Sequence, residues 1–431
     1  MDFIQYIIRF LVGEDVSSEV INSIGYTCDE QEIPHYKLVI YSSHFFNDNI
    51  YGTELSIPRI PLKIFENIPI LFGEPCLEKR GETCILHADL IASTYFLISR
   101  YEEIVRRNIR DNYGRFPGKE SLPYKALFID YPLVDKYGDL LRKLLRECGF
   151  NIPFLPQKIN KTYLTHDVDS LTKFRHLRGF LGSFRHLFKD RSVVTNSFKA
   201  NFSDLEKDPY YTFPFLFNCA KQLIKFDTTN IESIAFIKVR GELREDKPDI
   251  SVGNKDFRRF LKLAKGNNVK LGLHASYEAG INPALIKKEK EKLEKVVGYV
   301  SYNRHHFLSS REPEDMEMLI KAGITDDFTM GYADVSGFRL GTSRAVKWIN
   351  PKTKQLTNLI LHPLTVMDVT LSNSCYMGLN ETEAFDYVTK LIEETKTYNG
   401  DLCLLWHNTS VAEGLSYHKS LYKKLMDYLA K

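Results

Sequence analysis

Short apolar runs alternate with helix-type patterns from Lys161 to the end of the chain. The runs predicted to be strands cover 161–166, 232–238, 269–273, 299–303, 359–362 and 401–406. The predicted helices lie near 209–225, 256–266, 283–297, 312–322, 381–397 and 415–430, and glycine follows several of them as a stop signal. This alternation predicts a parallel sheet or barrel with its functional site at the carboxyl ends of the strands.

Residues 1–155 show a different pattern. It predicts an amphipathic helix in the first 16 residues, a strand at 36–41, a largely buried helix at 89–107 and a further amphipathic helix at 136–148. The proline-containing segment 151–156 is typical of a linker. We therefore predict a smaller α+β domain at 1–155 and a larger α/β domain at 156–431.

Composition narrows the class of protein. A length of 431 residues suits two domains, and the net charge of +3 argues against a nucleic-acid-binding protein. The seven cysteines form no CxxC pair, which favours a reducing compartment over a disulfide framework. The first apolar run lacks the basic start and cleavage site of a signal peptide, and no window is long enough to span a membrane. These features predict a cytoplasmic protein with, at most, peripheral membrane contact.

Four of the predicted strands end in side chains that can hold a metal ion or move a proton. They are Asp167 and Asp169 after the first strand, His274 after the third, Arg304, His305 and His306 after the fourth, and His407 after the last. Each has a simpler explanation when taken alone: a helix cap, a structural histidine or a surface histidine pair. Alternation along a strand places Arg304 and His306 on one side and His305 on the other. Because carboxyl ends of parallel strands meet at one edge, the shared position of these residues favours a single site.

The order of these residues resembles the motifs of the NodB-type polysaccharide deacetylases, carbohydrate esterases with a distorted (β/α) barrel and a divalent metal. Thr165-His-Asp-Val-Asp169 is similar to the first motif, and His274-Ala-Ser-Tyr-Glu278 to the second, HxxxH. Arg304, the LIKAGITDD segment at 319–327 and Leu405-Trp-His407 are similar to the third, fourth and fifth. The resemblance covers about residues 160–431. It implies the barrel fold for the second domain.

The resemblance also implies a role for each matching residue. Asp167 would be the general base and His407 the general acid, while Arg304 and Asp327 would orient these two groups. Asp169 and His274 would be metal ligands.

The chain departs from the family pattern at two positions. Glu278 stands where the second metal histidine is expected, and His306 stands where the third motif usually has proline. We expect His306 to supply the missing imidazole, with Glu278 as the alternative third ligand. Two histidines and one carboxylate suit Zn²⁺ first, and also Fe²⁺, Co²⁺ or Ni²⁺.

The implied reaction is metal-dependent removal of an N-acetyl, or alternatively O-acetyl, group from a saccharide or lipid-linked glycan in surface-polysaccharide biosynthesis. The substrate-binding candidates are Tyr277, Trp406 and Arg339, the last in the long irregular segment 331–354. One alternative is a catalytically inactive saccharide-binding protein on the same fold. A DxD phosphatase is another, but it would leave the histidines without a role. A DxD glycosyltransferase is the most distant, because no nucleotide site is visible.

A basic and aromatic segment at 173–191 repeats Phe-Arg-His-Leu at 174–177 and 184–187. A solvated helix pair over the barrel explains it simply. The alternative is a patch for an anionic glycan, a lipid-linked pyrophosphate or a membrane surface.

Overall fold

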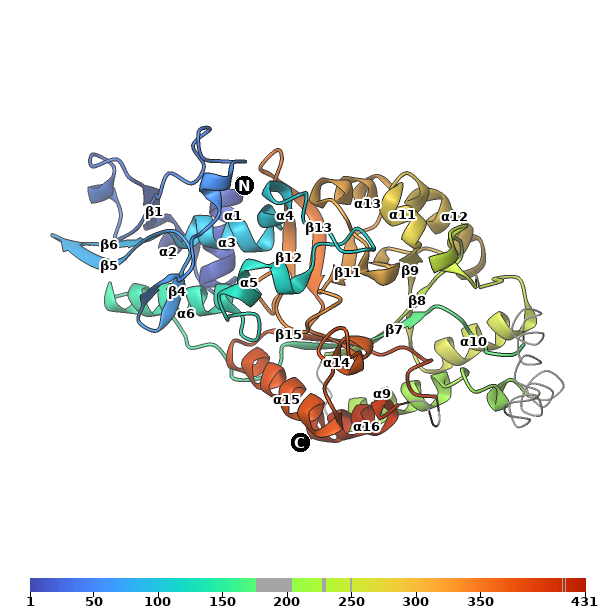
Figure 1. The fold of residues 1–431 in the computed structure, drawn as a ribbon. Coiled ribbons are helices and arrows are strands. Elements are labelled where there is room, and N and C mark those ends of the chain that lie inside the picture. Colours follow the sequence, from blue (N-terminus) through green and yellow to red (C-terminus); the bar gives the residue numbers. More distant parts are fainter. Residues whose placement is uncertain (176–203, 227–229, 249, 413, 415) are drawn as a thin grey trace.

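The computed structural model describes residues 1–175, 204–226, 230–248, 250–412, 414 and 416–431. Most of the basic segment at 173–191, with its predicted helix pair or anionic patch, lies outside these residues. The N-terminal unit lies at one end of the molecule and the long sheet with its helices at the other (Figure 1). Within the described residues, no helix combines the length and the apolarity needed to cross a bilayer.

Residues 1–155, all of them described, contain a four-stranded sheet in the order β1-β2-β6-β5. The strands of this unit are β1 (Ile24–Thr27), β2 (Leu38–Tyr41), β5 (Gly73–Arg80) and β6 (Thr83–Ala88), beside the hairpin β3 (Lys63–Phe65) and β4 (Ile68–Ile70). The helices are α1 (Phe3–Val12), α2 (Ser18–Asn22), α3 (Leu90–Ile98), α4 (Tyr101–Val105), α5 (Leu122–Lys125) and α6 (Leu133–Glu147). The single helix predicted at 89–107 is two helices, because Arg100 between them has a φ of 62°.

Nine strands in the described part of the chain form a second sheet, in the order β12-β13-β11-β10-β9-β8-β7-β15-β14. They are β7 (Lys161–Val168), β8 (Ile231–Ile237), β9 (Lys270–Ala275), β10 (Tyr302–His305), β11 (Asp326–Met330), β12 (Val346–Asn350), β13 (Gln355–Pro363), β14 (Val366–Met367) and β15 (Asp401–Leu405). Neighbours pair in parallel except β12 with β13. Among these strands, the edge strands β12 and β14 are not paired with each other. The sheet is therefore open where a barrel was expected.

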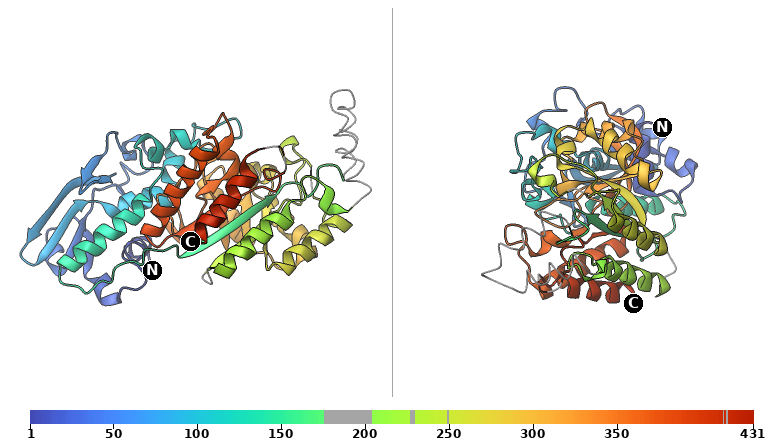
Figure 2. Two further views of the ribbon diagram at one scale, coloured as in Figure 1. Left: turned by 90° about the horizontal axis from the view of Figure 1, so that it is seen from below. Right: turned by 90° about the vertical axis from the view of Figure 1, so that its right-hand side faces the viewer.

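The described helices of the second unit include six near the predicted positions and two short ones, at 277–281 and 368–372, that the pattern did not predict. They are α9 (Phe213–Phe226), α10 (Lys255–Gly266), α11 (Tyr277–Ile281), α12 (Leu285–Val297), α13 (Glu317–Lys321), α14 (Asp368–Ser372), α15 (Glu381–Thr397) and α16 (His418–Leu429). Helix α15 begins at a capping box, in which Asn380 and Glu383 satisfy each other's backbone N–H groups. Helices α9, α15 and α16 lie on the same side of the sheet (Figure 2). The pattern did not predict β11, β12 and β14.

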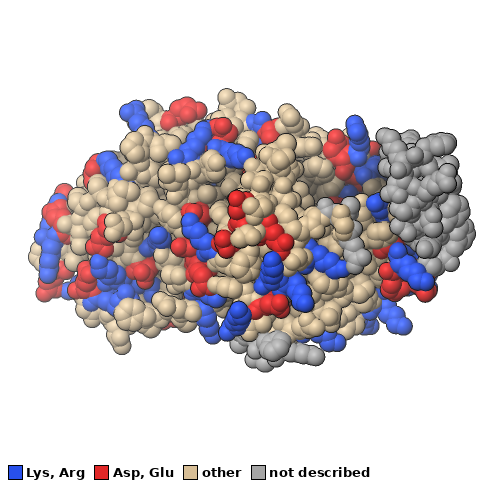
Figure 3. Space-filling model, turned by 60° about the horizontal axis from the view of Figure 1, so that its bottom comes forward, with Lys and Arg blue, Asp and Glu red and all other residues tan. Residues whose placement is uncertain are grey.

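Buried charge joins the two units. Asp135 of α6 accepts hydrogen bonds from Thr342, Ser343 and Arg344 of the second unit. Burial alone would raise the pKa of Glu103, but the guanidinium groups of Arg100 and Arg339 hold it at about 2. On the outer face in Figure 3, by contrast, basic and acidic side chains are intermixed.

Candidate functional site

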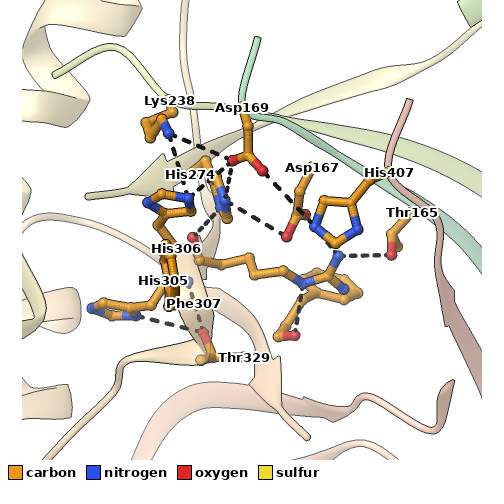
Figure 4. A network of polar contacts seen from close by, with 12 residues as sticks. Thr165, Asp167, Asp169, Lys238, His274, His305, His306, Phe307, Thr329 and His407 are labelled. Atoms are coloured by element: carbon orange, nitrogen blue, oxygen red, sulfur yellow. Dashed lines mark hydrogen bonds and ion pairs between the residues drawn. The ribbon is translucent and has the colours of Figure 1, made fainter. Parts of the chain in front are cut away.

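Three side chains converge at the carboxyl ends of neighbouring strands. Asp169 directly follows β7, His274 lies near the end of β9, and His306 directly follows β10. One ligand atom from each lies within 4.8 Å of the others. Asp169 Oδ1 is 3.3 Å from Nε2 of His274 and 3.3 Å from Nε2 of His306 (Figure 4). This group could hold a metal ion.

Both imidazoles are oriented through their other ring nitrogen. His274 Nδ1 is 2.9 Å from the carbonyl oxygen of Arg304, to which it donates. His306 Nδ1 is 2.9 Å from Asp246 Oδ1, and Asp246 is itself held by the backbone N–H groups of Tyr277 and Glu278. These partners turn Nε2 of each ring toward Asp169, the arrangement that metal-ligating histidines adopt. Sequence analysis missed Asp246, because no local pattern marks its loop.

The atoms at the centre of this group fit a cation. Asp169 Oδ1 and His274 Nε2 are both buried and have no hydrogen-bond partner among the described residues. Buried polar atoms without protein partners are rare and point to a bound water or ion. Burial would raise the pKa of Asp169, but His306, His274 and Lys238 hold it well below its usual range. Burial also lowers the pKa of His306, which favours the neutral ring that a ligand requires.

Lys238 is a further group at this centre that sequence analysis did not single out. It follows β8 and is almost fully buried. Its Nζ lies 3.4 Å from His306 Nε2 and 3.7 Å from Asp169 Oδ1 (Figure 4). The ammonium therefore adds positive charge and hydrogen-bond donors beside the candidate ligands.

Asp167 is held by a buried arginine. Arg304 Nη1 donates to Asp167 Oδ1 over 3.0 Å and to Thr165 Oγ1 over 2.8 Å, while its Nε donates to the carbonyl oxygen of Phe328. The guanidinium is fully buried, so its orientation is fixed by these bonds. The other carboxylate oxygen, Oδ2, lies 3.6 Å from His274 Nε2. Asp167 is thus placed beside the candidate ligands without being one of them.

His407 faces the same centre from the end of β15, with its Nε2 3.9 Å from Asp169 Oδ2. Its Nδ1 donates to Asp368 Oδ1 over 2.7 Å. Burial would lower the pKa of His407, but the carboxylates of Asp368, Asp169 and Asp167 raise it to about 10. The ring is therefore cationic at neutral pH. Asp368 is fully buried, and the sequence pattern did not reveal it.

A cavity of about 460 Å³ opens onto these groups. Its lining includes Asp167, Asp169, Lys238, His274, His306 and His407 from the ends of the strands, with Asn373 and Tyr376 nearby. Tyr113 and Arg115 of the N-terminal unit also line it. The cavity is therefore built by both units, and its volume is in the range of small-molecule sites.

Asp327 lies apart from the site, contrary to the role expected for it. Its carboxylate accepts hydrogen bonds from Asn303 and Thr329. Side chains alternate along β10 and β11, so Asp327 is on the side of Asn303 and His305, whereas Arg304 and His306 face the site. Asp368, not Asp327, contacts His407.

Four further expectations are corrected by burial or by contacts. Glu278, the alternative ligand, lies outside the candidate metal group and accepts a hydrogen bond from the backbone N–H of Glu242. Trp406 is fully buried, with its indole N–H donating to the carbonyl oxygen of His418. Arg339 is buried against Glu103. Tyr277 packs on the ring of Phe307 and is not among the described residues that line the cavity. None of these four side chains is among the described residues that line the cavity.

Comparison with known proteins adds distant likenesses. Residues 2–149 match a family of unknown function, DUF7033. No curated protein matches the chain. A solved structure described as a "putative polysaccharide deacetylase from Mycobacterium smegmatis" is 12% identical with a TM-score of 0.40, over 64% of this chain and 88% of its own.

Two further solved structures are similar at the same level. Puue allantoinase is 8% identical, with a TM-score of 0.37 over 63% of this chain and 84% of its own. A chain described as a "probable Polysaccharide deacetylase from Pseudomonas aeruginosa PAO1" is 10% identical, with a TM-score of 0.36 over 63% of this chain and 85% of its own.

Proposed function

We propose that the protein is a metal-dependent hydrolase that removes an acetyl group from a saccharide, an N-acetyl group first and an O-acetyl group as the alternative. The proposal rests on one cavity, which is lined by the three candidate metal ligands Asp169, His274 and His306. The same cavity is lined by Asp167, which Arg304 holds, and by His407, which Asp368 holds. These residues also follow the chain order that resembles the NodB-type deacetylases.

The side chains divide the work of hydrolysis between them. Asp169, His274 and His306 would hold a divalent cation, for which Zn²⁺ is the first candidate. Such a cation supplies Lewis acidity toward the acetyl carbonyl and lowers the pKa of a water molecule. Asp167, fixed by Arg304, would take the proton from the attacking water. Lys238 would donate to the oxyanion that develops on the acetyl oxygen.

His407 completes the reaction in this proposal. Asp368 keeps the imidazole cationic, so that Nε2 carries a proton toward the cavity. Donation of that proton to the departing amine or hydroxyl, as the acyl bond breaks, releases the deacetylated saccharide and acetate. The neutral ring is then recharged from solvent.

Acetate release is the direct test. The full-length protein is incubated with N- and O-acetylated monosaccharides, oligosaccharides and nucleotide sugars, with and without a chelator. We expect acetate from at least one substrate, loss of activity with the chelator or with Asp167→Asn, and recovery when Zn²⁺ is restored. Asp327→Asn is the matched control, because this carboxylate faces away from the cavity.

Two results would redirect the proposal. Saccharide binding without acetate release, in protein loaded with metal, would favour a non-catalytic saccharide-binding protein. Hydrolysis of p-nitrophenyl phosphate that persists in His407→Ala would favour a phosphatase. Action on a lipid-linked glycan in surface-polysaccharide assembly, at the cytoplasmic side, remains a prediction from the sequence.

A further inference from the structure

Three side chains of the N-terminal unit contact the loop 306–310, which follows β10 in the second unit. Arg115 Nη1 donates to the carbonyl oxygen of Phe307 over 2.9 Å. Arg100 donates to Ser310 through Nη1 to Oγ over 3.0 Å and through Nη2 to the carbonyl oxygen over 2.8 Å. The ring of Tyr113 packs on the ring of Phe307, with centroids 5.0 Å apart. The loop is therefore held at both ends by residues far away in the sequence.

The loop has a strained backbone, although the N–H of Ser309 donates to the carbonyl oxygen of His306 over 3.1 Å. Phe307 has a φ of 59° and Leu308 a φ of 53°. Two consecutive non-glycine residues with left-handed backbone angles are unfavourable, and such conformations persist only where the surroundings enforce them. The hydrogen bond from Arg115 falls on the carbonyl group of the first of these residues.

His306 is the residue directly before this backbone turn, and it is the candidate third ligand. Asp246 orients the ring of His306, whereas the backbone of His306 lies between the end of β10 and the turn at Phe307 and Leu308. A ligand must be held to within about 0.5 Å of its productive position. A shift of Phe307 would therefore carry the His306 ring away from Asp169.

Arg115 is itself pre-organised for this contact. Its Nε and Nη2 pair with Asp111 Oδ2 over 2.8 and 2.7 Å, and Nη2 also donates to the hydroxyl of Tyr376. Asp111 Oδ1 in turn accepts the backbone N–H groups of Tyr113 and Arg115. The guanidinium is almost fully buried and is locked between two units.

We propose that the N-terminal unit is an integral part of the metal centre, with Arg115 as a positioning residue that keeps His306 in place through the carbonyl group of Phe307. This gives the segment matching a family of unknown function a role: it supports the ligand that replaces the imidazole missing at Glu278. The inference rests on the metal site of the proposed function but not on deacetylation. A cation-binding measurement therefore separates the two, because either can fail while the other stands.

The experiment is titration of the metal-free, full-length protein with Co²⁺, followed by visible absorption and by calorimetry. Loss of a group that hydrogen-bonds a ligand typically weakens metal binding by about 10- to 100-fold. Because Arg115 acts one residue away from the ligand, we expect an increase in Kd at the lower end of this range, about tenfold, for Arg115→Ala. Arg115→Lys keeps one donor within reach of the carbonyl and should recover part of the affinity. Arg107→Ala is the matched control, because Arg107 crosses the same interface to Glu312 and Glu314 but does not contact the loop 306–310.

Circular dichroism and thermal unfolding establish that each variant is folded. Should Arg115→Ala not fold, Asp111→Asn and Arg115→Lys give the same information, since Asp111→Asn loosens Arg115 without removing it. A severalfold increase in the Kd of Asp111→Asn for Co²⁺ supports the proposal. Wild-type affinity in all folded Arg115 and Asp111 variants would overturn it. Equal weakening in Arg107→Ala would also overturn the positioning role of Arg115, because the effect would then come from the interface as a whole.

Discussion

His407 and Asp368 are joined by two hydrogen bonds. Nδ1 of the histidine donates to Asp368 Oδ1 over 2.7 Å, and the backbone N–H of His407 donates to Oδ2 over 2.7 Å. Burial would raise the pKa of this fully buried carboxylate, but the neighbouring His407 holds it below its usual range. Asp368 therefore keeps the imidazole of His407 protonated at the edge of the cavity.

Asp368→Asn tests this relationship. The substitution keeps the shape but removes the charge that raises the pKa of His407 to about 10, so this pKa should fall and the cationic ring should be lost at lower pH. We expect the alkaline limb of the kcat profile to move down by at least about one pH unit, with kcat reduced about 100-fold at its optimum. The measurement is acetate release across pH 5 to about 10. An unchanged alkaline limb would remove His407 from the role of general acid.

His306→Ala tests the ligand set. Removal of a ligand should cost more than the loss of an outer-shell partner, so Zn²⁺ affinity should fall by about 100-fold or more. Glu278→Ala should bind within about threefold of wild type, because Glu278 lies outside the candidate group. Metal content after dialysis, measured by mass spectrometry, distinguishes the two variants. The reverse result would make Glu278 the ligand.

Lys238→Met tests the buried ammonium. Two unit charges about 4 Å apart repel by about 4 kcal/mol at an effective dielectric constant of about 20. Rearrangement around the charges reduces this repulsion, and we expect the variant to bind Zn²⁺ about tenfold more tightly. Turnover should fall, because the proposed donor to the oxyanion is lost. Lys270→Met is the control, since Lys270 lies at the start of β9 and pairs with Glu232. Weaker metal binding in Lys238→Met would show that the amine helps to hold the cation.

Because His166 is buried, we predict that the folded protein loses stability in acid. It is fully buried on β7, with Nδ1 2.9 Å from the carbonyl oxygen of Trp406, and burial lowers its pKa to about 4. Because the unfolded state binds a proton at higher pH than the folded state, stability falls as pH drops below about 6.5 toward 4. The loss from this group is about 2 kcal/mol at pH 5 relative to pH 8.

Urea unfolding of wild type and His166→Gln at both pH values measures this loss. The variant cannot be protonated at this position, so its difference between pH 8 and pH 5 should be smaller than that of wild type by about 2 kcal/mol. The comparison cancels the contributions of other titrating groups. Equal differences in the two proteins would contradict the prediction.

The sequence by itself determined where the candidate site residues lie along the chain. Asp167, Asp169, His274, Arg304 and His407 could be recognised because each ends or follows a short apolar run. Such a run is a local signal for a buried strand, and polar side chains at its end are readable without knowledge of neighbouring segments. Alternation also predicted that Arg304 and His306 share a side, as they do.

Only the tertiary structure decided which groups support these residues. Asp246 and Asp368 come from segments that carry no distinctive pattern, and they reach the site through packing of segments far apart in the sequence. Lys238 ends a predicted strand, but only the structure brings its ammonium next to His306 and Asp169. The same holds for Arg115, which acts across the interface between the two units. Packing of the whole chain likewise determines that Trp406 is buried, that Asp327 faces away from the cavity and that the sheet stays open between its edge strands. Local patterns encode the ends of strands, whereas contacts between distant segments are set by the packing of the whole chain.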